Sequence, residues 1–324
     1  MSPVRFGLPL CAALFLATCS LSAQTADPTL VITPPPHGDP IVDILWPKGA
    51  PGAVGKTEAD IPKLYCYAAT GPGPHTAVVI LPGGGYTHLV MGKEGAFEAD
   101  WLNQHNISAC VLQYRLGPRY LYPWALLDGL RAVREVRAHA KDWGINPDAI
   151  GVWGFSAGGH MAGYLATAPP HGVPEGFGKL TTGTISMDAI DQEISARPDF
   201  AIINYGRVVL SVPQGKSPVL ATLIGDHPSQ ALIDYVDPIL HVTKDTSPTF
   251  LYATERDEKV DSTNATLFYN ALQKAGVPAE LHVFEQGPHG THMGTDQPKF
   301  PELAVYPILL EHWLQLHGWL PPTP

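Results

Sequence analysis

The segment Gly154-Phe155-Ser156-Ala157-Gly158-Gly159-His160 constrains the fold of this chain more than any other. It follows a short apolar run at residues 150–153 and precedes a stretch compatible with a helix at residues 161–166. A serine on a sharp turn between a strand and a helix needs glycine on both sides, because larger side chains would collide with the adjoining elements. The spacing therefore predicts a strand, a tight turn and a helix, with the hydroxyl of Ser156 projecting outward.

A length of 324 residues suits one large α/β domain or two small ones. Hydrophobic residues make up 45% of the 324 residues and charged residues only 15%, so a sizeable core is expected. The formal net charge of −10, with no basic block, argues against nucleic acid and anionic membrane surfaces as partners. After the N-terminal segment, no run reaches the ~20 apolar residues that a membrane span requires.

The N-terminus has the composition of a secretory signal peptide. Arg5 precedes an apolar stretch at residues 6–17, and small residues follow as far as Ala23. This order predicts an exported protein, periplasmic or secreted, with a leader at residues 1–23 and the mature domain at residues 24–324. Cys19 follows Leu16-Ala17-Thr18, a poor match to a bacterial lipoprotein box, so a lipid anchor is the less favoured alternative.

Beyond the leader the chain keeps two cysteines, Cys66 and Cys110, each inside a strand-like run. An exported chain meets oxidising conditions, which permit a disulfide. The two residues would be neighbours if they lay on the second and fourth strands of the expected sheet. We favour the alternative that both are separate buried thiols that act as small hydrophobic residues. Neither has the spacing of a zinc site.

Apolar runs alternate with helical patterns along most of the chain. Strands are expected at residues 77–81, 107–114, 150–153, 200–205, 249–253 and 279–284, and helices at residues 94–104, 123–143 and 262–275. The alternation predicts a single α/β domain with a mostly parallel central sheet and helices on both faces. Residues 171–197 and 206–247 break the pattern and are expected to form a lid, cleft walls or ordinary surface excursions.

A serine hydroxyl is a weak nucleophile and needs a base that accepts its proton. In folds with this turn, the order along the chain is serine, acid and then histidine. His289 lies in a turn-rich segment after the last expected strand, which is the position that this order requires. We predict His289 as the base, with His292 as its rival. His282, within the strand, is expected to be structural, and His160 is expected to have a supporting role.

The acid that orients the histidine is expected after the strand at residues 249–253. Four carboxylates follow that strand: Glu255, Asp257, Glu258 and Asp261. Asp257 lies between the strand end and the next helix, where a loop carboxylate can turn back toward the histidine. We predict Asp257 as the third member of a Ser-His-Asp triad, with Asp261 as the alternate, and assign the remaining carboxylates to a solvated charge run.

Acyl transfer at Ser156 also requires N–H donors for the oxyanion. The segment Pro82-Gly83-Gly84-Gly85-Tyr86 follows an expected strand, and its consecutive glycines let the backbone approach a substrate. We predict an oxyanion hole formed by the amides of Ala157, Gly84 and Gly85. Phosphate binding is disfavoured, because the loop lacks the P-loop lysine and no G-x-G-x-x-G opens a helix here.

Together these segments resemble the exported bacterial α/β-hydrolases of the carbohydrate esterase type, grouped as acetylxylan esterase-like or feruloyl esterase-like. The resemblance covers residues 78–290 and is carried by Pro82-Gly83-Gly84-Gly85-Tyr86, Tyr114-Arg115-Leu116, the helix start at residues 123–128, Trp143-Gly144-Ile145-Asn146-Pro147, the serine segment, Phe268-Tyr269, Gly276-Val277-Pro278 and Pro288-His289-Gly290. It implies an α/β-hydrolase fold, a Ser156, Asp257 and His289 triad, and no metal or organic cofactor.

The resemblance further implies hydrolysis of short acyl esters, such as acetyl groups, on plant cell-wall carbohydrate such as xylan. Tyr86, Trp124 and Tyr205 are candidates for lining the substrate cleft, or for core positions. The alternatives are a feruloyl esterase, a lipase, a serine peptidase of the same fold, and a non-catalytic binding protein on a hydrolase scaffold. The acyl group, the alcohol that bears it and the oligomeric state are left open.

Overall fold

The computed structural model describes residues 39–171, 188–211 and 219–321, together with Met1. The expected leader, including Cys19, lies outside the described residues apart from Met1. Part of each irregular stretch, at residues 172–187 and 212–218, also lies outside them.

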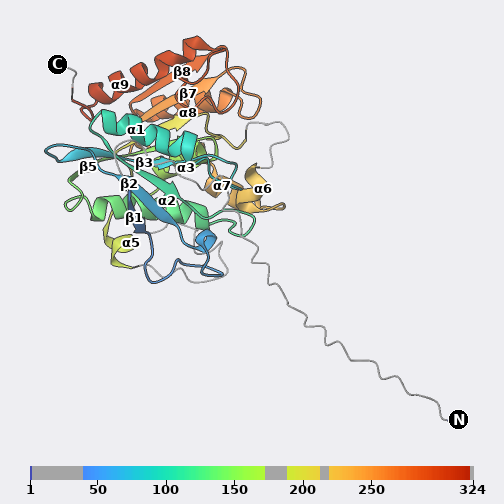
Figure 1. Cartoon of the computed structure of the whole chain (residues 1–324). Coiled ribbons are helices and arrows are strands. Elements are labelled where there is room, and N and C mark those ends of the chain that lie inside the picture. Colours follow the sequence, from blue (N-terminus) through green and yellow to red (C-terminus); the bar gives the residue numbers. More distant parts are fainter. Residues whose placement is uncertain (2–38, 172–187, 212–218, 322–324) are drawn as a thin grey trace.

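The described residues contain an eight-stranded sheet with the strand order β1-β2-β4-β3-β5-β6-β7-β8 (Figure 1). The strands are β1 (Ile41–Ile44), β2 (Lys63–Tyr67), β3 (His75–Leu81), β4 (Ser108–Gln113), β5 (Ile145–Phe155), β6 (Phe200–Asn204), β7 (Thr249–Thr254) and β8 (Ala279–Phe284). All pairings among β3 to β8 are parallel, whereas β2 runs antiparallel to both of its neighbours. The prediction of a mostly parallel sheet is confirmed.

The helices follow the alternation of the sequence. They are the short η2 (Glu58–Asp60), η3 (Gly92–Ala96), η4 (Pro238–His241) and η5 (Pro301–Val305), and the α-helices α1 (Phe97–Gln104), α2 (Trp124–Ala138), α3 (Ala157–Thr167), α5 (Ala189–Glu193), α6 (Val219–Ile224), α7 (Gln230–Val236), α8 (Thr263–Ala275) and α9 (Tyr306–Leu316). In the described ranges, no helix has both the length and the apolar character that crossing a membrane demands.

Helices cover both faces of the sheet. Trp153 of β5 and Phe250 of β7 project from the same face of the sheet, because both are aligned with Ile202 of the intervening strand β6. Trp101 of α1 contacts Trp153, and Trp313 of α9 contacts Phe250, so α1 and α9 lie on this face (Figure 1). The opposite face carries α2 and α3, which pack on β5 and on each other. The central strands are consequently buried on both sides, and all residues of β4 and β6 are buried.

Two helix predictions need adjustment. The pattern expected at residues 123–143 forms a regular helix only as far as Ala138, and turns continue to Gly144, which has a left-handed φ of 67°. The pattern at residues 94–104 is divided between η3 and α1, and Glu94, within η3, has non-helical backbone angles. The exposed edge strand β1, and the helices α5, α6, α7 and α9, are not among the predicted elements.

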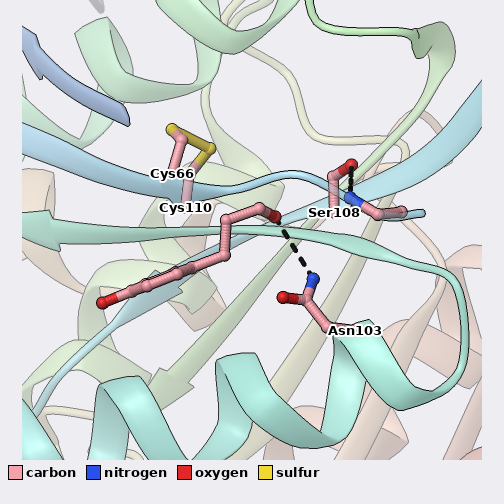
Figure 2. The surroundings of a disulfide bond; sticks show 6 residues. Cys66, Asn103, Ser108 and Cys110 are labelled. Carbon is pink, nitrogen blue, oxygen red and sulfur yellow. Dashed lines mark hydrogen bonds between the residues drawn. A yellow bond between two sulfur atoms is a disulfide. The ribbon is translucent and has the colours of Figure 1, made fainter. Parts of the chain in front are cut away.

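Cys66 and Cys110 form a disulfide, so the favoured interpretation as separate thiols is wrong (Figure 2). The physical reason is the register: β2 pairs antiparallel with β4, and Cys66 lies directly opposite Cys110. Neighbouring polar contacts hold the same strand ends. Ser108 accepts from Ala69 N (3.0 Å), and Asn103 Nδ2 donates to Tyr67 O (3.2 Å).

Removing this disulfide is expected to destabilise the protein. The bond closes a sequence separation of 44 residues, and its loss enlarges the unfolded ensemble. For the double variant Cys66→Ala/Cys110→Ala we expect a Tm lower by roughly 5–15 °C, measured by calorimetry. Dithiothreitol should lower the Tm of the wild type and leave that of the variant unchanged. Free thiols at these positions in unreduced, denatured wild type would contradict the pairing.

Candidate active site

Ser156 occupies the sharp turn from β5 into α3 that its glycine spacing predicts. Its backbone has φ 52° and ψ −111°, a conformation that L-residues rarely adopt. The flanking glycines are required sterically, since a Cβ on Gly154 would lie 2.1 Å from Gly158 O and one on Gly158 would lie 1.9 Å from Leu81 O. The turn is anchored by Ser156 N, which donates to Asn204 O of β6 (3.0 Å). Small residues therefore make this strained turn possible.

A continuous hydrogen-bond chain joins the serine to a histidine and a carboxylate. Ser156 Oγ lies 2.8 Å from His289 Nε2, and His289 Nδ1 lies 2.7 Å from Asp257 Oδ2. The side chain of Asp257 is 1% exposed and that of His289 is 9% exposed. The carboxylate is oriented by its own turn, because Asp257 Oδ1 accepts from Lys259 N (2.8 Å) and Val260 N (2.9 Å). With Nδ1–H donated to Asp257, Nε2 is free to accept from the serine hydroxyl.

The rival residues have other partners. Asp261 accepts from Thr263 N at the start of α8 (2.8 Å), and Glu255 accepts from the hydroxyl of Ser262 (2.6 Å). Glu258 is not simply solvated, since its Oε2 accepts from His289 N (3.2 Å). His292 Nδ1 lies 3.3 Å from Asp296. The geometry therefore brings together Ser156, His289 and Asp257. Asp261 is bonded to α8 instead, and His292 lines the same cavity but is paired with Asp296.

The glycine loop after β3 lies beside the serine. Gly84 and Gly85 have left-handed φ values of 123° and 62°, and a Cβ on Gly84 would lie 2.1 Å from His88 O. Both glycines line the same cavity as Ser156. Ala157 follows Ser156 as the first residue of α3, where helix N–H groups lack intrahelical partners. These are positions from which backbone amides can serve an oxyanion.

Ser156 opens into a cavity of about 450 Å³. Its lining residues are Gly84, Gly85, Thr87, His88, Val90, Glu94, Ser156, Thr222, Lys259, Val260, His289, Gly290 and His292. Thr222 comes from α6, within the irregular stretch at residues 206–247, and its hydroxyl donates to Gly85 O (2.6 Å). Part of that stretch is therefore a cleft wall. The lining combines small or aliphatic side chains with charged and hydroxyl groups, a mixture suited to a small polar ligand.

The aromatic candidates do not line this cavity, and their assignment as cleft residues is corrected. Tyr86 is 1% exposed, because its side chain turns inward and its hydroxyl donates to His160 Nδ1 (2.8 Å). Tyr205 is 3% exposed, and its ring edge contacts His289. Trp124 is half-buried and packs over the guanidinium of Arg115. All three therefore act through packing or hydrogen bonding.

His160 has the supporting role that its position suggests. It is buried, its Nε2 donates to Val236 O (2.7 Å), and its Nδ1 accepts from the Tyr86 hydroxyl. Burial lowers the pKa of His160 to about 4, so the ring is neutral near neutral pH. This contact ties the glycine loop to α3, directly beneath the serine turn.

Two groups were not singled out by sequence patterns. Glu94 lies in the cavity wall, yet only its place at the start of a helical pattern marked it. Elsewhere, Asp43 on β1, Glu135 on α2 and His139 just after α2 hold possible metal-ligand atoms within 4.8 Å of one another. Arg131 donates to Glu135 there (2.8 Å), so a guanidinium cation already occupies the position beside the carboxylate. We assign no metal to this group.

The fold and the site define a protein of the α/β-hydrolase fold, and known ester hydrolases resemble it in sequence and in structure. A structure of an acetyl ester-xyloside bifunctional hydrolase from Caldicellulosiruptor lactoaceticus superposes with a TM-score of 0.76 at 32% identity, covering 89% of this chain and 99% of that one. An acetylxylan esterase from Xylanibacter ruminicola is 33% identical over 72% of this chain and 44% of its own length. Endo-1,4-beta-xylanase B from Butyrivibrio fibrisolvens is 29% identical over 73% of this chain and 36% of its own length.

The family model BD-FAE matches residues 64–272, and the chain belongs to this family. The match begins in β2 and ends within α8, so it includes the glycine loop, the Ser156 turn and Asp257. The chain spans less than half the length of the two curated relatives named above.

Proposed function

We propose that this protein is a serine esterase that removes short acyl groups, acetyl above all, from xylan-type carbohydrate. The observation that carries the proposal is the hydrogen-bond chain from Ser156 through His289 to Asp257. The names of the relatives, an acetylxylan esterase and an acetyl ester-xyloside hydrolase, support the substrate class.

The proposed mechanism is two-step acyl transfer. Ser156 Oγ attacks the ester carbonyl while His289 Nε2 takes the hydroxyl proton, and Asp257 stabilises the resulting imidazolium. The amides of Ala157, Gly84 and Gly85 stabilise the oxyanion. His289 then protonates the departing sugar oxygen, which leaves an acyl group on Ser156. Water deprotonated by His289 attacks that ester, and Ser156 regains its proton as the carboxylic acid departs.

The character of the cavity favours a short acyl group on a polar alcohol. Val90, Val260 and the glycine loop supply a short apolar lining, and Lys259, His292 and Thr222 offer polar contacts. A lipase would need a larger apolar cleft for a long acyl chain. Hydroxyl-rich sugars match these polar groups through hydrogen bonds.

Export, periplasmic or secreted, belongs to the same proposal, with the leader at residues 1–23 and the catalytic domain within residues 24–324. The Cys66–Cys110 disulfide supports it, because such bonds persist mainly in oxidising compartments.

Acetate release from acetylated xylan tests the function. We expect acetate from the wild type and none above background from Ser156→Ala. Release of ferulate from feruloylated arabinoxylan, without release of acetate, would leave the triad assignment in place and change the proposed acyl group to feruloyl. Preference for a long-chain p-nitrophenyl ester or a tripeptide anilide would indicate a lipase or a peptidase. No product from any of them would favour a binding protein.

A further inference from the structure

Glu94 is a buried carboxylate in the wall of the catalytic cavity that the proposed mechanism does not use. It lies in η3, it is 4% exposed, and its backbone departs from helical geometry at φ −123° and ψ 32°. Burial raises the pKa of Glu94, and the hydrogen bonds from Gly83 N–H and Tyr205 together with the nearby His292 and His289 offset only part of that rise. Placing a carboxylate here is unfavourable unless its contacts compensate for the lost hydration.

The contacts of Glu94 join three loops at the carboxyl edge of the sheet. Glu94 Oε2 accepts from Gly83 N in the glycine loop after β3 (2.8 Å). Glu94 Oε1 accepts from the hydroxyl of Tyr205 after β6 (3.0 Å). The same hydroxyl accepts from His292 N in the histidine loop after β8 (3.1 Å). One carboxylate therefore connects the loops of the oxyanion donors and of the base.

Each connected loop is close to the reacting groups. Gly83 directly precedes the two predicted oxyanion glycines, and a Cβ on it would lie 2.8 Å from Phe155 O and 3.0 Å from Ser156 Cβ. Tyr205 is held at a left-handed φ of 39°, and its ring lies 5.0 Å from that of His289 in an edge contact. A shift of the glycine loop would therefore displace the oxyanion donors relative to Ser156, and a shift of Tyr205 would displace the base.

We propose that Glu94 is a positioning residue that sets the distance between the oxyanion loop and the histidine loop through Gly83 N–H and the Tyr205 hydroxyl. The proposal builds on the serine esterase function proposed above. Gly83 N–H and the Tyr205 hydroxyl both donate to Glu94, one to each carboxylate oxygen. A glutamine at this position accepts only through one oxygen, so its NH₂ group must face either Gly83 N–H or the Tyr205 hydroxyl, and one contact is lost or inverted.

The test compares Glu94→Gln, Tyr205→Phe and the double variant with p-nitrophenyl acetate as substrate. Glu193→Gln, an exposed carboxylate on α5, is the matched control for the chemical change. For Glu94→Gln we expect kcat per titrated active site to fall about 100-fold, as for loss of an oxyanion donor, with KM changed less than about threefold. The Ki of a trifluoromethyl ketone, which mimics the tetrahedral intermediate, should rise in proportion.

Tyr205→Phe keeps the ring on His289 and removes only the hydroxyl, so we expect a smaller loss of about five- to tenfold in kcat. The double variant should resemble Glu94→Gln alone, because both changes break one network. An unchanged kcat and an unchanged ketone Ki in Glu94→Gln would overturn the proposal, as would a loss explained wholly by fewer titratable sites. If Glu94→Gln does not fold, Tyr205→Phe decides by the same two measurements.

These outcomes are separable from failure of the proposed function. Wild-type turnover retained in Ser156→Ala would refute the serine mechanism whatever Glu94 does. Turnover of p-nitrophenyl acetate without release of acetate from xylan would refute the proposed natural substrate. The comparison of the Glu94 variants would remain valid.

Discussion

Ser156→Ala is expected to lower kcat by about 10⁴- to 10⁶-fold for p-nitrophenyl acetate and acetylated xylan. The expected loss is large because the hydroxyl is the group that becomes acylated. Without it, His289 has no nucleophile of the enzyme to deprotonate. The 2.8 Å contact between Ser156 Oγ and His289 Nε2 is the geometry that makes the attack feasible. Residual activity would come from direct attack of water on the ester, with the oxyanion donors still stabilising the intermediate.

Two histidine variants extend this test: His289→Ala removes the base, and His292→Ala is the matched control for loss of an imidazole. His289→Ala should be impaired nearly as much as Ser156→Ala, and combining the two should add little, because they act as a unit. With p-nitrophenyl acetate, which carries no sugar, His292→Ala should change kcat much less, because the His292 ring contacts Asp296 and not the triad. Labelling by an organophosphonate should modify Ser156 in the wild type. Labelling elsewhere, with turnover retained in Ser156→Ala, would refute the assignment.

Asp257→Asn is expected to lower kcat by about 10⁴-fold without unfolding the protein. Asp257 Oδ1 already accepts from Lys259 N and Val260 N. An asparagine oxygen should keep those contacts, which turns its NH₂ group toward His289 Nδ1. The imidazole must then carry its proton on Nε2, and Nε2 can no longer accept from Ser156. The measurement is kcat together with Tm at neutral pH.

Asp261→Asn is the control for this prediction. Asp261 makes the same kind of contact to a backbone amide, but it lies on the exposed side of the turn, bonded to Thr263 N. We expect its kcat to stay within about twofold of the wild type, as for most surface substitutions. Comparable losses in both variants would indicate that Asp257 acts through the turn rather than through His289.

Features that depend on neighbouring residues are predictable from the sequence. The turn at Ser156 follows from glycines at positions 154 and 158, whose missing side chains make room for it. Apolar runs predict the buried stretches of β3 to β7, because strands covered on both faces consist mainly of hydrophobic residues. Gly276 ends α8 in a left-handed conformation, as its place after the helical pattern predicts. By contrast, β1 is short and mostly exposed, so periodicity gives little sign of it.

Selection among similar residues depends on contacts between distant segments. Asp257 and Glu258 are adjacent and chemically alike, yet one meets the histidine ring and the other its backbone. The disulfide depends on the β2–β4 register, which is not encoded near either cysteine.

Local chemistry therefore determines the serine turn, the strand and helix alternation and the order of the candidate triad, because glycine conformation and hydrophobic periodicity act over a few residues. Long-range packing determines which carboxylate faces His289, why Tyr86 and Tyr205 are buried, and how Glu94 joins three loops. These contacts depend on where β3, β6 and β8 end in space, and that is set by the assembled sheet.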